Sequence, residues 1–291
     1  MKKNNNIDFN VSNVNQKVEL YGWVLRKRNL GGLIFIDLRD RSVVIQLVVN
    51  PDSKYYDLAH DLKNEYVIRV EGVIVKRQSP NSNLKTGEIE VEVSNLEVLN
   101  TSLDIPFTIS DDTTASEETR LKYRYLDIRR NPIKDRLITR SNITYYVREF
   151  LHNEKFIEVE TPILCKSTPE GARDYLVPSR IFPLLMIGGM ERYFQIAKCF
   201  RDEDLRADRQ PEFSQIDLEM SFFSEEDVMD LTERLIAYVF KKIKNIDIKL
   251  PLMKMKYDDA INYYGSDKPD LRFDMKINDI TDIFINTNIT M

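Results

Sequence analysis

Short runs of alternating apolar and polar residues follow one another from Lys17 to about Leu99. They are separated by polar or glycine-rich breaks at 29–32, 51–53 and 79–87. Because successive side chains point to opposite faces of a strand, this alternation is typical of strands with one buried face. About five short strands in this length favour a small closed barrel of the OB type, a fold that binds oligonucleotides on one face.

Alternation also predicts which side chains of three of these strands face the core and which face outward. The inward positions are apolar: Ile34, Ile36, Leu38, Val43, Ile45, Leu47, Val49, Ile89, Val91 and Val93. The outward positions include Phe35, Asp37, Gln46 and Glu90. An aromatic ring stacks on splayed RNA bases, and amide and carboxylate groups bond to base edges. The other interpretation is that Phe35 packs under a loop and the charges are solvated.

Cations that could meet RNA phosphates lie in the same stretch, at Arg26, Lys27, Arg28, Arg39 and Arg41. The chain as a whole is acidic, with a net charge of −5 and a pI of about 5.4. Any RNA-binding face would therefore have to be a local basic patch.

The stretch from Asn100 to Thr119 has no periodicity and reads as a linker. The sequence EETRLKYRYLDIRR at 117–130 is basic and aromatic. It fits a hinge that contacts a neighbouring domain or RNA, and it fits a plain amphipathic helix equally well. We expect three parts: 1–103, 104–134 and 135–291.

The second half of the chain predicts helices packed on a sheet. A helical stripe is formed by Ile143, Tyr146, Val147, Phe150 and Leu151. A strand from Phe156 to Thr161 follows and ends at Pro162. After the hairpin described next, Ser224 and Asp227 form a capping-box pattern. The buried stripe of that later helix would be Val228, Leu231, Leu235 and Val239.

Two apolar arms flank a charged loop between 193 and 220, which predicts a hairpin. Pro211 in its middle excludes a helix. On the returning arm, Ile216, Leu218 and Met220 share one face, and Gln215, Asp217 and Glu219 share the other. A surface that combines Arg201 with these carboxylates could hold a polyanion and its Mg²⁺. A solvated charged hairpin is the alternative.

The composition restricts the class of protein but does not indicate a function. With 291 residues, 42% hydrophobic and 31% charged, the chain is long enough for two domains with real cores. The two cysteines and two histidines show no ligand spacing, so we expect no structural zinc and a reducing compartment. The N-terminus shows no targeting segment, and no run of about 18 apolar residues occurs. We therefore expect a soluble, cytoplasmic protein.

The run FRDEDLRADRQPEFSQIDLEM at 200–220 resembles motif 2 of class II aminoacyl-tRNA synthetases, and in detail that of the bacterial-type aspartyl-tRNA synthetases. The resemblance implies that Arg201 binds the α-phosphate of ATP and the substrate carboxylate. It implies that Glu203 orients ATP or its metal, and that Phe213 stacks on adenine. Arg201 and Glu203 are thus the expected catalytic residues, with ATP and Mg²⁺ as cofactors.

The same resemblance assigns the other side of the hairpin to aspartate and tRNA. Gln215 and Asp217 would lie against the aminoacyl group. Arg206, in the loop between the arms, would read the acceptor end of the tRNA. The sequence PEGARDY at 169–175 resembles the mobile loop over the amino-acid site, where Glu170 would meet the substrate ammonium.

The stretch GWVLRKRNLGGLIFIDLRD at 22–40 resembles the anticodon-binding domain of the same family. The resemblance implies that Phe35 stacks on the anticodon. The implied base contacts are Arg28, Gln46 and Glu90, with Asn81 a weaker candidate. The helix, strand and proline ending at Pro162 resemble motif 1, which implies a homodimer interface.

The sequence departs from the family at two places. Between Arg180 and Met186 the family has a QSPQ run and a lysine that line the aspartate pocket, whereas this chain has IFPLL. Motif 3, whose arginine holds the other face of adenine, has no counterpart here. Adenylate formation by this chain alone is therefore not expected, because it depends on groups that act together.

The resemblance implies an α+β multidomain fold, in which an OB-fold barrel precedes part of a class II antiparallel-sheet catalytic domain. The implied activity is ATP-dependent ligation of aspartate to tRNA(Asp). One alternative is a catalytically inactive tRNA-binding fragment or paralogue, which lacks motif 3 and the pocket segment. A weaker alternative is an ATP-binding protein of this fold that acts on another substrate.

Overall fold

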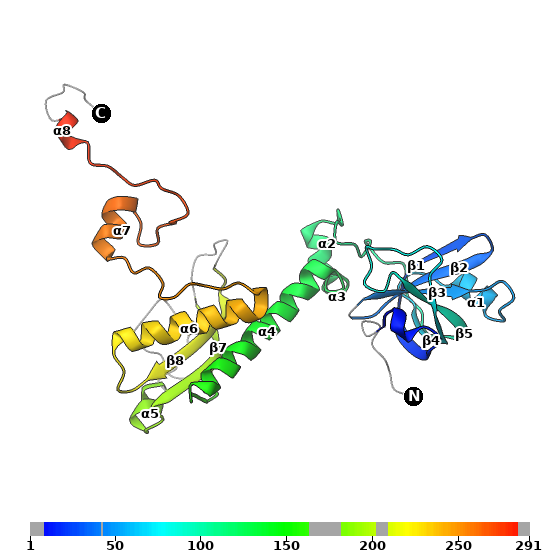
Figure 1. Ribbon diagram of the computed structural model, residues 1–291, viewed down its shortest axis with the longest axis horizontal. Helices are drawn as coiled ribbons and strands as arrows, with labels where there is room; N and C mark the ends of the chain where they lie inside the picture. The colour runs from blue at the N-terminus through cyan, green and yellow to red at the C-terminus, as the bar shows by residue number, and fades with distance from the viewer. Residues whose placement is uncertain (1–8, 42, 163–181, 202–208, 285–291) are drawn as a thin grey trace. The chain divides into compact units, whose positions relative to one another are not determined.

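The computed structural model describes residues 9–41, 43–162, 182–201 and 209–284. The chain divides into two compact units, 1–135 and 136–291 (Figure 1). The first unit contains the barrel and all of the predicted linker and hinge. Each unit is considered below by itself.

Five strands form a closed barrel in the order β1-β2-β3-β5-β4, which confirms the predicted fold. The strands are β1 (Lys17–Leu30), β2 (Leu33–Arg39), β3 (Val44–Val49), β4 (Val67–Lys76) and β5 (Ile89–Asn100). Neighbouring strands are antiparallel except β3 and β5, which pair in parallel and close the barrel. A closed barrel leaves no open edge on which another chain could add a strand.

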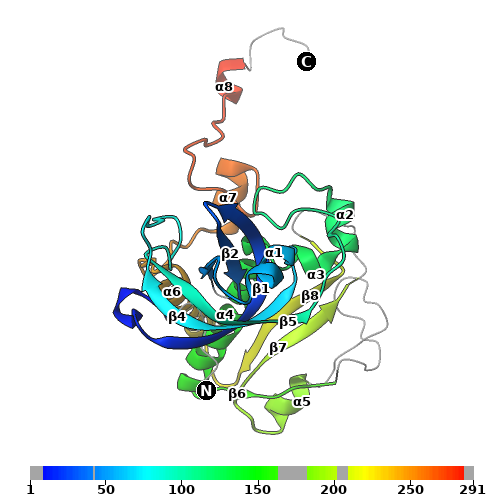
Figure 2. The ribbon, with the colours of Figure 1, turned by 90° about the vertical axis from the view of Figure 1, so that its right-hand side faces the viewer.

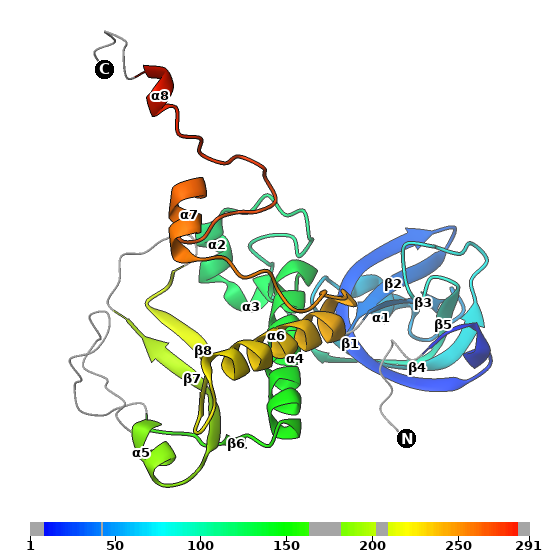
Figure 3. The same cartoon turned by 60° about the vertical axis from the view of Figure 1, so that its left-hand side comes forward.

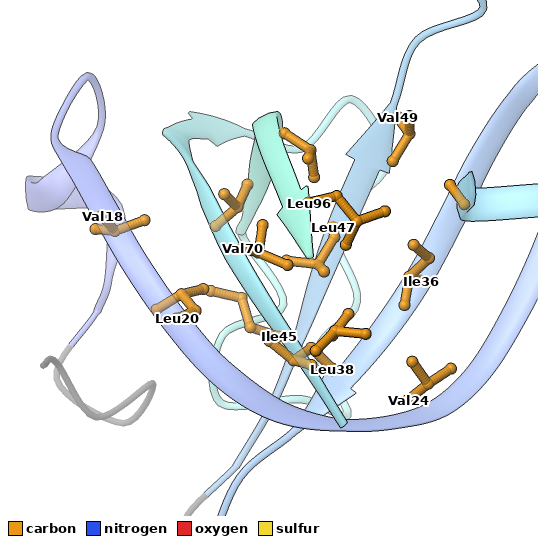
Figure 4. Packing of buried hydrophobic residues seen from close by; sticks show 14 of the residues in the cluster. Val18, Leu20, Val24, Ile36, Leu38, Ile45, Leu47, Val49, Val70 and Leu96 are labelled. Atoms are coloured by element: carbon orange, nitrogen blue, oxygen red, sulfur yellow. The ribbon is translucent and has the colours of Figure 1, made fainter. Parts of the chain in front are cut away.

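The barrel interior is filled by the apolar side chains that occupy every second position along the strands (Figure 4). Ile36, Leu38, Ile45 and Leu47 have no exposed surface, as the alternation predicted. Truncating one such leucine to alanine costs on the order of 2 to 5 kcal/mol of stability. Val43 was expected in the core but lies outside β3 and is only half-buried. It belongs to the turn before β3, where its amide donates to the Asp40 carboxylate over 2.9 Å.

The connections hold more structure than the sequence indicated. A 3₁₀ turn (Val11–Asn13) precedes β1, and Gly31 and Gly32, both with positive φ, turn β1 into β2. Helix α1 (Tyr56–Asp61), which the pattern did not predict, lies between β3 and β4. The predicted linker has its own buried cluster, formed by Phe107, Ile109 and Leu126.

The segment after the linker forms two short helices, α2 (Glu117–Lys122) and α3 (Arg124–Asp127), rather than one amphipathic helix. Asp127 is fully buried and accepts hydrogen bonds from Arg124 and Arg130. These arginines, together with Arg120, hold the pKa of the Asp127 carboxyl below its usual value against the opposing effect of burial. The basic residues of the hinge are therefore partly used to neutralise a buried acid.

The second unit is built on a three-stranded sheet in the order β6-β7-β8. Its elements are α4 (Asn131–Asn153), which begins in the first unit, β6 (Ile157–Glu158), α5 (Phe182–Ile187), β7 (Arg192–Phe200), β8 (Glu212–Met220), α6 (Glu225–Lys244), α7 (Tyr257–Tyr264) and α8 (Thr281–Phe284). The predicted hairpin is the antiparallel pair β7–β8, and β6 pairs with β7 in parallel.

Helices α4 and α6 cover one face of the hairpin (Figure 3). Val147 and Leu151 from α4 meet Leu231 and Leu235 from α6 around Phe194 of β7. This arrangement confirms that both helices present an apolar stripe to the sheet. The stripe of α6 is shorter than predicted, because Val228 is 39% exposed. The opposite face of the hairpin carries its polar side chains.

The ends of α6 follow its sequence signals. Ser224 is the N-cap, and its hydroxyl and the Asp227 carboxylate form a reciprocal capping box, as predicted. Helix α5 packs beside the start of β7 (Figure 2). Among the described residues, no helix is both long and apolar enough to cross a bilayer.

Candidate functional site

The first candidate site lies on the outer face of the barrel, where polar side chains from four strands meet. The register places Phe35 opposite Arg28 and Gln46 opposite Glu90. Phe35 is partly exposed, so its ring is available at the surface. Phe35 and the predicted contacts Arg28, Gln46 and Glu90 thus lie on one continuous face.

These polar groups are bonded to one another rather than simply exposed. Arg28 Nη2 donates to Asp37 Oδ1 over 2.9 Å and to Gln46 Oε1 over 3.1 Å. Gln46 Nε2 donates to Glu90 Oε2 over 2.6 Å. Asp37 and Gln46 were expected to face solvent, but only 6% and 7% of their surface is exposed. Alternation gives the face of a side chain correctly, yet neighbouring polar groups on that face can cover it.

Arg77, which the sequence analysis did not select, is part of the same network. It follows β4 directly, and its Nη2 donates to Gln46 Oε1. The alternation along β4, continued by one residue, turns the side chain of Arg77 outward. This is the signal that could have identified Arg77 as a residue of the polar face. Asn81, in contrast, is exposed in the β4–β5 connection, where its backbone amide donates to the Gly87 carbonyl over 2.9 Å.

The second candidate site is the polar face of the β7–β8 hairpin. Arg201 follows β7, and its guanidinium carbon lies 5.1 Å from the centre of the Phe213 ring. The Arg201 amide donates to the Pro211 carbonyl over 2.9 Å, which holds the two arms together at this end. A cation and an aromatic ring side by side offer a phosphate contact next to a flat stacking surface.

Further along β8, acidic and amide side chains continue on the same face. Gln215 Nε2 lies 3.4 Å from Asp217 Oδ1. Asp217 Oδ2 is buried and has no partner among the described residues. Burial raises the pKa of Asp217, and burial together with the charge of Asp217 raises the pKa of Glu219. A half-buried carboxylate with one oxygen free of hydrogen bonds is suited to an incoming cation.

Tyr193 lies opposite Glu219 in the register and is fully buried. Its pKa is raised by burial and by the nearby charges of Asp217 and Glu219. Gln195, opposite Asp217, exchanges hydrogen bonds with Thr161. Strand β7 therefore places a buried phenol with a raised pKa and a hydrogen-bonded amide beside the two carboxyl groups of β8.

Three predicted site residues, Glu170, Glu203 and Arg206, lie outside the described residues. Of the described residues, no group of three or more His, Cys, Asp or Glu side chains is arranged to hold a metal ion. Mg²⁺ at nucleotide sites is commonly held by one or two carboxylates together with substrate phosphates. On this face Glu219 is a described carboxylate of the kind that such a site uses, separate from Asp217.

Comparison with known proteins agrees with this architecture. The family model of class II tRNA synthetases (D, K and N) matches residues 116–288, and an OB-fold nucleic acid binding domain matches residues 18–99. Aspartate–tRNA ligase of Oceanobacillus iheyensis is 52% identical over 294 residues, which cover 94% of this chain and 50% of that protein. The aspartate–tRNA(Asp/Asn) ligase of a Geobacillus species is also 52% identical, with 94% and 50% covered.

The chain spans about half the length of the curated relatives it matches. Among solved structures, asparaginyl-tRNA synthetase of Pyrococcus horikoshii in complex with asparaginyl-adenylate is 25% identical, with a TM-score of 0.74, over 84% of this chain and 59% of that one. Aspartyl-tRNA synthetase of Entamoeba histolytica shares the fold, with 20% identity and a TM-score of 0.75, over 89% and 62%. The synthetase model covers more than half of the sequence, so the chain belongs to the class II tRNA synthetases (D, K and N), with an OB-fold nucleic acid binding domain before the synthetase domain.

Proposed function

We propose that this chain forms part of an aspartate–tRNA ligase of the bacterial type. The observation that carries the proposal is the polar face of the β7–β8 hairpin, which places Arg201 beside Phe213 at one end and the unpartnered Asp217 oxygen at the other. The names of relatives at 51% to 54% identity support aspartate as the amino acid. They favour the ligase over an inactive tRNA-binding paralogue.

The reaction has two steps. An α-carboxylate oxygen of aspartate attacks the α-phosphorus of ATP, and the bond from that phosphorus to the bridging oxygen breaks to release pyrophosphate. A terminal ribose hydroxyl of the tRNA then attacks the carbonyl carbon of the adenylate, and AMP leaves. Bound Mg²⁺ would spread the charge of the leaving pyrophosphate. No covalent enzyme intermediate is needed, because the adenylate is already activated.

The described residues divide this work between the two ends of the hairpin. The Arg201 guanidinium stabilises negative charge that develops on the α-phosphate, and the Phe213 ring stacks on adenine. Asp217 and Gln215 hold the amino acid, with Asp217 pairing its ammonium. Glu170 and Glu203 complete the site as the expected contacts of the ammonium and of ATP or its metal. Arg206 meets the acceptor end of the tRNA.

The barrel binds the anticodon of tRNA(Asp) through the face that contains Arg28, Phe35, Gln46 and Glu90, with Asn81 at its edge. Stacking on Phe35 supplies affinity, and the hydrogen-bonding groups supply base recognition. Residues 1–103 serve as the anticodon domain, 104–134 as the linker and hinge, and 135–291 as part of the catalytic domain. A cytoplasmic location follows from a role in translation.

The motif 1 region, α4 and β6, forms a homodimer interface. Exposed apolar side chains on it support this assignment: Leu137 is 50% exposed, Ile138 is 44% exposed, Tyr145 is 58% exposed and Ile157 is 48% exposed. Apolar surface of this kind is commonly covered by a partner. Sedimentation of wild type and Tyr145→Asp across a concentration series tests it, since the variant should stay monomeric where wild type dimerises.

The experiment for the activity is aspartate-dependent exchange of labelled pyrophosphate into ATP, measured on a full-length protein that contains this sequence. Exchange that requires aspartate and is not supported by asparagine or lysine is expected. Exchange with either of those amino acids, but not with aspartate, would refute the assignment of the amino acid while leaving the family intact.

A further inference from the structure

Arg77 is a buried member of the polar face of the barrel. Only 7% of its side chain is exposed. Its Nη2 donates to Gln46 Oε1, its Nη1 lies 3.4 Å from the Gly87 carbonyl oxygen, and its Nε lies 3.8 Å from Glu90 Oε2. The guanidinium therefore contacts two of the proposed base-contacting side chains, Gln46 and Glu90.

These contacts fix the orientation of the Gln46 amide. Its oxygen accepts from two cations, Arg28 and Arg77, and its nitrogen donates to the Glu90 carboxylate. In the reversed orientation, the amide N–H groups would face both guanidinium groups and the amide oxygen would face a carboxylate. Each of the three contacts would then be repulsive, so charge alone selects one orientation.

The fixed amide has one kind of hydrogen bond left to offer. A side-chain amide oxygen has two acceptor positions, and both are used by arginine donors. The amide nitrogen has two hydrogens, and only one is used by Glu90. Gln46 can therefore donate to an approaching base but cannot accept from it.

We infer that Arg77 is a positioning residue that makes Gln46 a hydrogen-bond donor, so that this face selects a base with an acceptor atom at the position that Gln46 meets. A carbonyl oxygen or an unprotonated ring nitrogen meets this requirement, and an exocyclic amine does not. The inference rests on the proposed binding of tRNA by the barrel face.

A purely structural role for Arg77 predicts something different. Arg77 also ties down the β4–β5 connection through the Gly87 carbonyl, and its loss would loosen that loop together with Asn81. Thr86 ties the same loop to β3 through a 2.6 Å hydrogen bond from its Oγ1 to the Val44 carbonyl, without touching Gln46. Thr86→Val is therefore a matched control that loosens the loop and leaves the amide in place.

The test measures binding of the full chain to anticodon stem–loop RNA of tRNA(Asp), with the loop bases varied one at a time. The variants are Arg77→Met, Arg77→Lys, Thr86→Val and Gln46→Glu. Wild type should prefer, at one loop position, bases with an acceptor over bases with a donor by about fivefold to tenfold, which is what one hydrogen bond contributes. Arg77→Met should reduce that preference to below about twofold, and Arg77→Lys should restore part of it, because an ammonium keeps the charge and a donor.

Thr86→Val should keep the preference at that position even where it weakens binding overall. Gln46→Glu replaces the donor by an acceptor, so its preference at the same position should shift to bases with an amine. This variant keeps the test decisive if Arg77→Met does not fold. A wild-type preference that persists in Arg77→Met, or is lost equally in Thr86→Val, overturns the inference alone. A wild type that binds none of the RNAs overturns the proposed tRNA binding as well.

Discussion

The guanidinium of Arg129 lies over the ring of Trp23, with 5.0 Å between the guanidinium carbon and the ring centre. Arg129 also donates to the Glu65 carboxylate, which accepts two further hydrogen bonds, of 2.9 Å and 2.7 Å, from Arg39. The Glu65 side chain is 3% exposed. The buried carboxylate is thus held between a barrel strand and the end of the hinge, which makes the hinge part of the same folded unit.

Arg129→Ala should lower the free energy of unfolding of this unit by about 1 to 3 kcal/mol, because Glu65 then keeps only one of its two cations. Trp23 is the only tryptophan in the chain, so its fluorescence reports directly on the site. Denaturant unfolding followed by this fluorescence gives the measurement. Lys63→Ala is the control, since it removes an exposed cation two residues from Glu65. Equal stability of the two variants would show that the contact between Arg129 and Glu65 does not stabilise this unit.

Phe35→Ala should weaken binding of tRNA by about 1 to 3 kcal/mol through the loss of stacking on a base. Titration with anticodon stem–loop RNA at one fixed salt concentration checks this value. Tyr21→Ala is the control, because it removes another outward aromatic ring of the barrel, at a position where β1 pairs with β4. The Tyr21 hydroxyl donates to the Glu19 carboxylate over 2.8 Å. A loss of affinity in Tyr21→Ala as large as that in Phe35→Ala would argue against specific stacking.

Arg201→Ala should reduce aspartate-dependent pyrophosphate exchange at least about 100-fold in a full-length protein that contains this sequence, because charge on the α-phosphate loses its stabilising cation. Binding of tRNA through the barrel should be retained. Lys198→Ala on the same hairpin is the matched control, since Lys198 is 52% exposed and pairs with Glu212. Normal pyrophosphate exchange in Arg201→Ala would show that this face of the hairpin is a solvated surface with no role in the reaction.

Asp217→Asn should stabilise the fold at neutral pH, although it removes a proposed aspartate contact. The folded-state pKa of Asp217 is raised above its ordinary value of 3.8 by burial. Its contribution to stability is therefore full below 3.8 and is lost as the pH rises through the folded-state pKa. The advantage of the variant should accordingly appear at neutral pH and vanish in strong acid, in urea unfolding measured across this range.

Asp227→Asn provides a comparison of opposite sign. Hydrogen bonds from Ser224 hold the pKa of Asp227 below 3.8, so its stabilising effect is present above that value and is lost as the pH falls through the folded-state pKa. This variant should be less stable than wild type at neutral pH and should match it in strong acid. The same pH trend in both variants would show that general charge, rather than these two environments, governs stability.

Much of the fold was predictable because alternation and helical spacing depend only on which side chains are apolar. The inward parity of Ile36 and Leu47, the hairpin and the capping box of α6 all follow from local patterns. Helix α1 was missed because its six residues are too few for a clear helical period.

The parts of the candidate sites that were missed depend on partners far away in the chain. The alternation along β4 indicates that Arg77 faces outward, but it does not indicate that the guanidinium reaches Gln46, which lies 31 positions earlier. Glu65 similarly meets Arg129 across 64 positions. Alternation along a strand predicts that a polar side chain lies on the outer face. Whether neighbouring side chains on that face bury it depends on how the barrel closes.

The parallel pairing of β3 with β5 has a consequence for biosynthesis. Gln46 and Glu90 are 44 positions apart, and their hydrogen bond requires β5, which is the last strand of the barrel to be made. Closing so long a loop comes late in folding, because its entropy is lost before the contacts form. A nascent chain on the ribosome should therefore show no preference among anticodons until Ile89–Asn100 has left the exit tunnel. Base recognition by this domain would then appear in one step with the last strand rather than grow gradually along the chain.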